Sequence, residues 1–419
     1  MHWKPKILLE IMGAVFLCLA LTAGAQTQTA PTTPPAAPSD AKTALPATPV
    51  APAPPADAAA APLAMPAMVG PLSTASPATF DAGRYFGKLQ VTGILSGFGY
   101  VQDNHSSSDH LKYADVSNAQ VFVQKTSGLV QFYLQGGAYN IPALGTPFLS
   151  TRDTVTDFFG ALPQGYIKLA PKGSFSYLAG KLPTLIGAED TFTFENMNIE
   201  RGLLWNQENA VNRGLQVNYS KGKLSAALTW NDGFYSNRYN WIWGMFTYTP
   251  NAANSVEVVG GGNYGKTAYS SVATPLYQNN SSIYNVIYTH TAKKWILEPY
   301  IQITYVPLNA HIGVAHATST IGGAVLGTYT FTSHVSLAAR GEYIGSTGST
   351  GNGAVNLLYG TGSEAWSMTL TPTYQDKAFF ARAEFSAVHA MDTTPGDVFG
   401  TDGTDVTQAR GMIEAGFMF

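Results

Sequence analysis

The densest group of ionisable side chains in this chain lies between residues 183 and 212. The sequence there is PTLIGAEDTFTFENMNIERGLLWNQENAVN, and its charged members are Glu189, Asp190, Glu195, Glu200, Arg201 and Glu208. Only 12% of the whole chain is charged, whereas about 25% is usual for soluble domains. Two functions fit such a concentration: a ring of charge that sorts solutes in an aqueous passage, or ion pairs that hold a loop in place.

Other residue types capable of chemistry are scattered. The chain has no G-x-S-x-G elbow, and its histidines form no Ser-His-acid set on one wall. His311 and His316 lack a spaced partner set for a metal, and the Asp/Gly-rich stretch 397–405 is typical of turns. The single cysteine is Cys18. We therefore expect neither an enzyme nor a bound cofactor or metal.

The elements that would position the acids are strands. Beyond about residue 80, apolar and polar residues alternate with period 2, and Gly, Asn, Asp, Ser and Pro clusters separate the runs. The pattern predicts sixteen strands (about 14–18), at 88–101, 114–126, 129–140, 164–170, 174–182, 213–220, 223–231, 240–249, 255–263, 283–291, 295–306, 321–332, 334–345, 363–372, 378–388 and 410–419.

The links between these strands alternate between short and long. Short links such as 126–128, 171–173 and 221–223 all fall at one end of the sheet, and long ones such as 141–163 and 183–212 fall at the other. This sorting is typical of outer-membrane barrels. The sequence therefore predicts an all-β fold, a transmembrane antiparallel up-and-down β-barrel spanning 81–419.

The two faces of the predicted strands support a water-filled lumen. One face is apolar, as lipid contact requires, and the other carries charge. Sixteen strands leave an aqueous interior. The predicted pore-wall charges are Lys168, Arg213, Glu298, Arg340, Glu342, Arg382 and Glu384.

The N-terminus has the composition of an export signal. Lys4 and Lys6 precede an apolar run that ends at Leu21, and Ala23-Gly24-Ala25 offers a cleavage site. We predict a signal peptide over 1–25. Residues 26–80 hold 13 of the 25 prolines and are predicted to be a disordered Ala/Pro/Thr-rich spacer, whose role stays open.

The last strand, RGMIEAGFMF, places Phe417 and Phe419 on its apolar face. A terminal Phe on such a strand looks like the assembly signal of Gram-negative outer-membrane proteins, which implies the barrel-assembly machinery as a partner. Residues 179–190 (AGKLPTLIGAED), 198–201 (NIER) and 213–233 (RGLQVNYSKGKLSAALTWNDG) also resemble the OmpL-like β-barrel porin family. The resemblance covers most of 80–419.

This resemblance implies a porin of the bacterial outer membrane, in contact with lipid, that lets small hydrophilic solutes or ions diffuse passively. The stretch 183–212 links the fifth and sixth strands, where general porins fold a loop inward as a constriction. Analogy with general porins implies a homotrimer. A net charge of −3 indicates no nucleic-acid partner. The alternative is a non-conducting barrel that acts as an adhesin or anchor.

Overall fold

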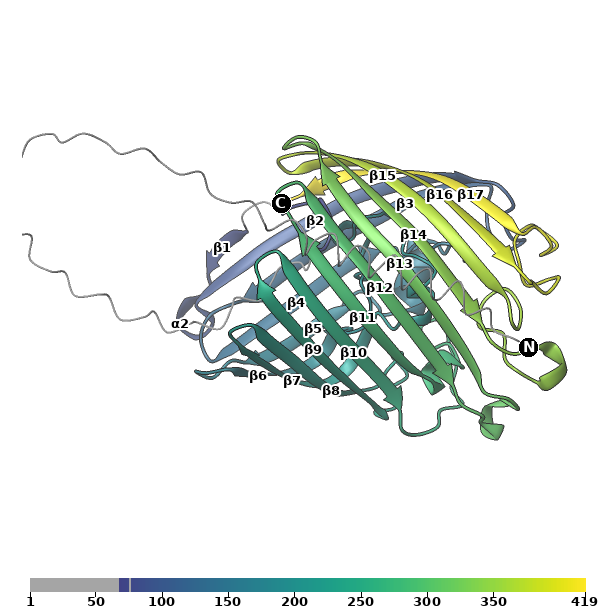
Figure 1. Ribbon diagram of the computed structural model, residues 1–419. Coiled ribbons are helices and arrows are strands. Elements are labelled where there is room, and N and C mark those ends of the chain that lie inside the picture. The colour runs from purple at the N-terminus through teal and green to yellow at the C-terminus, as the bar shows by residue number, and fades with distance from the viewer. Residues whose placement is uncertain (1–67, 75–76) are drawn as a thin grey trace, which may run out of the picture. The chain divides into compact units, whose positions relative to one another are not determined.

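Sixteen consecutive strands form one closed antiparallel sheet (Figure 1). The computed structural model describes residues 68–74 and 77–419. The predicted signal peptide, and the predicted spacer as far as residue 67, lie outside the described residues. Each strand pairs with its neighbours in sequence, and β17 pairs with β2 to close the ring. The predicted up-and-down barrel of sixteen strands is thus confirmed.

The observed strands match the predicted ones to within a few residues. They are β2 (Lys88–Gln102), β3 (Lys112–Lys125), β4 (Val130–Tyr139), β5 (Gln164–Leu169), β6 (Phe175–Pro183), β7 (Val211–Lys221), β8 (Leu224–Asn231), β9 (Trp241–Asn251), β10 (Asn254–Asn263), β11 (Ser282–Thr291), β12 (Trp295–Val306), β13 (Thr318–Thr330), β14 (Val335–Ser346), β15 (Glu364–Asp376), β16 (Phe379–Met391) and β17 (Thr407–Met418).

The remaining elements are short. They are β1 (Ala78–Asp81), the helices α2 (Gly83–Phe86) and α3 (Thr151–Asp157), and the 3₁₀ turns η1 (Thr193–Glu195), η2 (Trp205–Gln207), η3 (Gln278–Asn280), η4 (Ala310–Ile312) and η5 (Thr350–Asn352). Among the described residues, no helix is long and apolar enough to cross a membrane.

The chain end completes the closure of the barrel. Phe419 exchanges two backbone hydrogen bonds with Gly93, of 2.7 and 3.0 Å, and its ring occupies the space where a Cβ on Gly93 would stand. Below this point β1, which the sequence did not predict, pairs with the same edge of β2. The part of the β2 edge that β17 does not reach is therefore paired with β1, so its backbone groups are not left unsatisfied.

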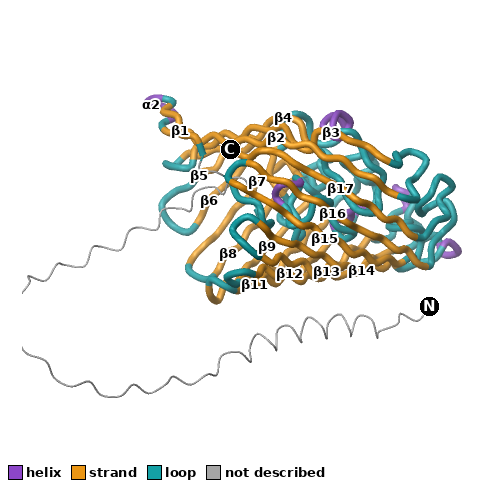
Figure 2. Tube along the Cα trace, turned by 90° about the horizontal axis from the view of Figure 1, so that it is seen from above, coloured by secondary structure: helices purple, strands orange, loops and turns teal. Residues whose placement is uncertain are grey.

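The links sort by length, as predicted. The turns at one end, such as 222–223 and 377–378, contain only a few residues, while links such as 140–163, 184–210 and 264–281 lie at the other. Figure 2 shows β1 and α2 at the short-turn end and most of the irregular chain at the opposite, long-loop end.

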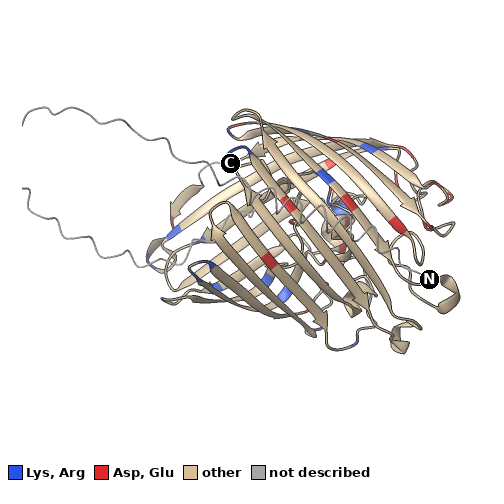
Figure 3. Ribbon diagram, viewed as in Figure 1, with Lys and Arg blue, Asp and Glu red and all other residues tan. Residues whose placement is uncertain are grey.

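The strands alternate between two faces. On β16, Phe379 and Phe385 are exposed on the outward face, while Phe380, Arg382 and Glu384 are buried on the inward one. Figure 3 shows how few charged positions the barrel wall carries. Because side chains alternate with period 2, an apolar outward face directs the sparse charges of each strand into the lumen.

Residues 68–74, here called the inner segment, lie inside the barrel. The amides of Val69 and Gly70 donate to the carbonyl of Glu195, at 2.8 and 3.2 Å. Leu72 is buried among inward side chains that include Phe122 and Phe380. These residues pack and hydrogen-bond although they belong to the stretch 26–80 that the sequence analysis assigned to a spacer.

Candidate constriction site

The link between β6 and β7, residues 184–210, folds into the barrel and is here called the inward loop. Every residue from 191 to 205 is buried. The loop keeps its shape through its own polar groups: the Asn196 side chain accepts from the amide of Asp190 at 2.7 Å and donates to the carbonyls of Asp190 and Phe192. Such a brace substitutes for the backbone pairing that a strand would provide.

Three groups of contacts hold the inward loop against β14–β17. The first is centred on Arg340 of β14. Its Nη1 lies 2.5 Å from Glu189 and 2.7 Å from the carbonyl of Glu200, and its Nε lies 3.2 Å from Glu342. Glu342 in turn accepts from the amide of Leu203 at 3.0 Å. Burial raises the pKa of Glu189, and the charge of Arg340 opposes that rise.

The second group is centred on Glu200. Its carboxylate pairs with Arg410 of β17 and accepts from the hydroxyl of Ser386 at 3.1 Å. The backbone amides of Ile199 and Glu200 both donate to Glu384 of β16, at 2.5 and 2.9 Å. A wall carboxylate thus holds two loop amides, while a wall guanidinium neutralises the loop acid.

The third group pairs Arg382 of β16 with Glu414 of β17. Arg382 also donates to the carbonyls of Thr193 and Asn196, at 2.9 and 3.2 Å, and Glu414 accepts from the hydroxyl of Thr193 at 2.8 Å. All the charged residues in the three groups are buried. Breaking such a pair by removing one partner costs about 3–5 kcal/mol, because the other charge stays buried alone.

A second set of loop residues lacks such partners. Neither carboxylate oxygen of Glu208 has a hydrogen-bond partner in the described residues, nor has Oδ2 of Asp190. Burial, followed by the nearby charge of Glu189, raises the pKa of Asp190 to about 6 and that of Glu208 well above its ordinary value. Burial likewise raises the pKa of Glu195, whose Oε2 accepts from the amide of Phe192.

Arg201 is completely buried, and none of its three guanidinium nitrogens has a hydrogen-bond partner in the part of the chain that the structure describes. Its guanidinium carbon lies 5.6 Å from the ring centroid of Trp205. Burial lowers the pKa of Arg201 to about 10. Buried guanidinium groups normally have partners, so this group needs a polar species beside it.

The remaining predicted wall residues fall into two classes. Lys168 and Glu298 point inward, as predicted, and Glu298 accepts from Thr289 at 2.9 Å. Arg213 does not, because it shares the outward face of β7 with Leu215 and Val217. Its Nε donates to Asp232 at 2.7 Å, at the long-loop end. At the start of this strand the observed alternation is one residue out of phase with the predicted one.

Two wall residues that hold the inward loop were not predicted from the sequence. Arg410 and Glu414 lie on the inward face of β17. The prediction that Phe417 and Phe419 face outward already implied their position, since the opposite face of the same strand must hold 410, 412 and 414. The contribution of the link 140–163 could not be read in this way: Leu144 donates to the carbonyl of Arg201 at 2.9 Å.

The two sides of the lumen differ. Inward residues of β14–β17 are buried under the inward loop and the inner segment. On β5–β10 the inward residues nearer the short-turn end are only partly buried, namely Lys168, Gln216, Asn218, Thr247 and Glu257, whereas Trp241 and Trp243, nearer the long-loop end, are buried against Ile186 of the loop. At the long-loop end, a cavity of about 280 Å³ lies between the links, and its lining includes Phe148, Trp205, Glu208 and Phe234. Within the described residues, no group of three or more His, Cys, Asp or Glu could hold a metal ion.

Comparisons with known proteins agree with this architecture. Residues 88–419 match the family model described as "Putative beta-barrel porin-2, OmpL-like". No curated protein sequence matches the chain. Among solved structures, in-vitro folded OmpT, an outer membrane protein of Vibrio cholerae, has 12% identity and a TM-score of 0.54, over 81% of this chain and 99% of that one.

Two further solved structures have the same fold. The outer membrane channel DcaP of Acinetobacter baumannii is 10% identical, with a TM-score of 0.54 over 82% of this chain and 100% of that one. Salmonella typhi OmpF, in complex with daunomycin, is 10% identical, with a TM-score of 0.52 over 79% of this chain and 98% of that one. At these identities the likeness establishes the fold alone.

Proposed function

Because this chain belongs to the family of OmpL-like β-barrel porins, and is therefore a porin-like barrel of the bacterial outer membrane, we propose that it forms a passive channel for small hydrophilic solutes. The inward loop is its constriction. The protein acts by diffusion through the barrel rather than as an enzyme. Outer-membrane barrels carry their long links on the outer side, so solutes enter at the long-loop end.

The observation that carries this proposal is that the buried ion pairs of the inward loop lie together on one part of the barrel wall. Its three contact groups lie on β14–β17, through Arg340, Arg382 and Arg410. On the part of β5–β10 nearer the short-turn end, inward polar side chains stay partly exposed from strand to strand. A loop held firmly against one wall narrows a barrel without requiring that the other wall be sealed.

The unpaired acids give the proposed channel its selectivity. The carboxylates of Glu189 and Glu200 are neutralised by arginines, so they contribute little net field. Asp190 and Glu208 have no such cation among the ion pairs of the described residues. Where these acids are ionised, their unpaired charge in a narrow, low-dielectric passage attracts ions of opposite sign. The channel is expected to prefer cations.

Single-channel recording in planar bilayers tests both parts of the proposal. Refolded protein should give discrete conductance steps, and the substitutions Asp190→Asn and Glu208→Gln should lower the cation-to-anion permeability ratio. Asp157→Asn is the matched control, because Asp157 is an exposed acid of α3 that lies outside the inward loop. Deleting 189–208 should raise conductance. An unchanged permeability ratio in both lumenal variants would refute the selectivity assignment.

A non-conducting barrel is the second candidate, and one observation favours it. The inner segment packs against the inward loop and bonds to it through Val69 and Gly70, so two segments of chain occupy the lumen. The complete absence of conductance steps from correctly folded protein would select this function. Steps that appear only after the inner segment is removed would assign the occlusion to that segment.

Assembly into a trimer is part of the proposal as well. One solved Vibrio cholerae OmpT structure is described as a trimer form, and a barrel with a largely apolar outward face can bury part of it against copies of itself. Cross-linking in native membranes, followed by electrophoresis, should give a ladder that ends at three chains. A ladder that stops at one chain would contradict the trimer.

A further inference from the structure

The lipid-facing wall carries a groove near the long-loop end. It has a volume of about 460 Å³ and is formed where β5 to β8 and the link before β9 meet. One side of the groove is formed by Gly165, Ala179 and Gly180, and it is low because these residues have little or no side chain. Leu162, Leu215 and Trp230 border it with exposed apolar surface.

Basic groups lie at the same place. Lys181 and Arg213 are both part of the groove lining. Lys181 donates to the carbonyls of Phe159 and Leu162, at 3.0 and 2.9 Å, and has no acidic partner among the ion pairs of the described chain. Two neutral acceptors leave its charge uncompensated and one of its three donors available.

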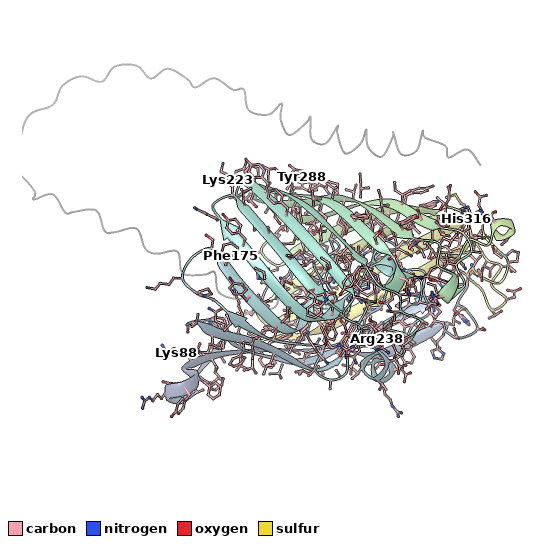
Figure 4. The ribbon with its side chains drawn as sticks, turned by 90° about the horizontal axis from the view of Figure 1, so that it is seen from below. Lys88, Phe175, Lys223, Arg238, Tyr288 and His316 are labelled. Carbon is pink, nitrogen blue, oxygen red and sulfur yellow. The ribbon has the colours of Figure 1, made fainter. Side chains whose placement is uncertain are left out.

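Arg213 and Arg238 extend this basic edge. The Nε of Arg213 is paired with Asp232 at 2.7 Å, and its Nη2 donates to the carbonyl of Tyr235. Arg238 is exposed and adjoins Tyr239, a groove residue. Figure 4 shows Arg238 displaced from Lys88 and Phe175 toward the long-loop end. With Asp232 counted against Arg213, the edge keeps a net positive charge.

The order of these features along the barrel axis is that of an amphiphile. Apolar, small-residue wall lies on the strands, and Trp230 and Tyr239 lie at their ends. Lys181 and Arg213 line the groove beside these aromatic residues, and Arg238 is exposed next to Tyr239 in the chain. Aromatic residues occupy the membrane–water interface in such barrels, and Arg and Lys recognise phosphate. Acyl chains on the wall would thus bring a phosphate to the bases.

We propose that this groove binds a phosphorylated, multiply acylated lipid of the outer leaflet, with its acyl chains over Ala179 and Leu215 and its phosphate at Lys181, Arg213 and Arg238. The site is independent of conduction, because all of these groups lie on the outward face or outside the lumen. The proposed lipid site can therefore be tested separately from the proposed channel.

Native mass spectrometry of the purified full-length protein tests the proposal with lipid A as the probe. Lipid A should remain bound to the wild type, while dephosphorylated lipid A and phosphatidylethanolamine should not. The double variant Lys181→Met/Arg238→Met should weaken lipid A binding about tenfold or more, as expected for the loss of charge-assisted hydrogen bonds. Arg213 is left in place because its removal would strand the buried Asp232.

Two further variants separate the alternatives. Lys112→Met is the matched control, because Lys112 is an exposed outward base at the same end of β3, and it should leave binding within about twofold. Ala179→Phe fills the groove without a change of charge and should also weaken binding. The heat-dependent gel mobility of each variant confirms that the barrel is folded.

Three results would overturn the proposal. One is equal lipid A binding by the wild type and the double variant. Another is full competition by inorganic phosphate, which would make the site an anion site without a lipid requirement. The third is that Ala179→Phe abolishes an oligomer while lipid binding is unchanged, since the face would then belong to a contact between copies.

Discussion

Replacing Arg340 with methionine should release the inward loop without unfolding the barrel. Arg340 contacts Glu189, the carbonyl of Glu200 and Glu342 at 2.5, 2.7 and 3.2 Å, all in buried surroundings. Methionine keeps most of the volume but leaves the two carboxylates unpaired, at a cost of about 4 kcal/mol. The equilibrium between docked and undocked loop would shift by about a thousandfold.

A single thiol reports this shift. Cys18 is the only cysteine in the chain and lies within the predicted signal peptide, so Thr191→Cys introduces the sole label into a buried site of the loop. In the Arg340→Met background, the rate of modification by a membrane-impermeant maleimide should rise by up to the same factor, since labelling follows the population of the open form. Single-channel conductance should rise and its distribution should broaden.

Two variants serve as controls. Arg152→Met removes an exposed arginine of α3 that forms no ion pair with the inward loop among the described residues, and should leave the labelling rate unchanged. Arg340→Lys keeps the charge and should give an intermediate rate. If Arg340→Met yields a heat-modifiable, folded barrel whose Thr191→Cys thiol reacts no faster than in the parent, the contacts of Arg340 do not hold the loop, and the reasoning fails.

Three other outcomes are expected. The pKa of Asp190 is raised to about 6, so its carboxylate is charged above that pH and neutral below it; the cation-to-anion permeability ratio should fall as the pH drops from about 8 to about 5, and Asp190→Asn should remove this dependence. Deleting Phe419, whose backbone closes on Gly93, should lower the fraction of heat-modifiable barrel in the outer membrane, whereas Phe419→Tyr should not; equal yields would contradict a role in assembly. The intact mass of the exported protein should correspond to a chain that begins at Gln26, and any other N-terminus would disprove the predicted cleavage site.

Local rules were sufficient to predict the barrel. The period of 2 and the turn residues determine strands, and the sorting of link lengths determines their direction, so all sixteen strands could be placed without knowledge of a contact. β1 was not predicted, because its four exposed residues, ATFD, contain too little alternation to be distinguished from a spacer. The prediction for Arg213 failed for a related reason: one residue of uncertainty at a strand end inverts the face.

The candidate site was less predictable, because its contacts join distant parts of the sequence. The acids of 183–212 could be recognised by their concentration, but their sorting into paired and unpaired groups could not. Whether Glu189 meets Arg340 while Glu208 meets no cation depends on how the loop crosses the lumen. No periodicity encodes that path, and the same limit applies to the inner segment, whose composition alone indicates a spacer.

The anchoring of the inward loop also has a consequence for how the molecule forms. Its bonds join residues that are 151 positions apart for Arg340 and Glu189, 210 for Arg410 and Glu200, and 221 for Thr193 and Glu414. Contacts of such separation form late, because the entropy of closing a long segment of chain must be overcome first. The loop is synthesised well before its partners, so it cannot settle until β14–β17 are in place. The narrowing of the lumen is thereby tied to completion of the wall, and a chain that stops short of its last strand would leave both the seam and the passage open.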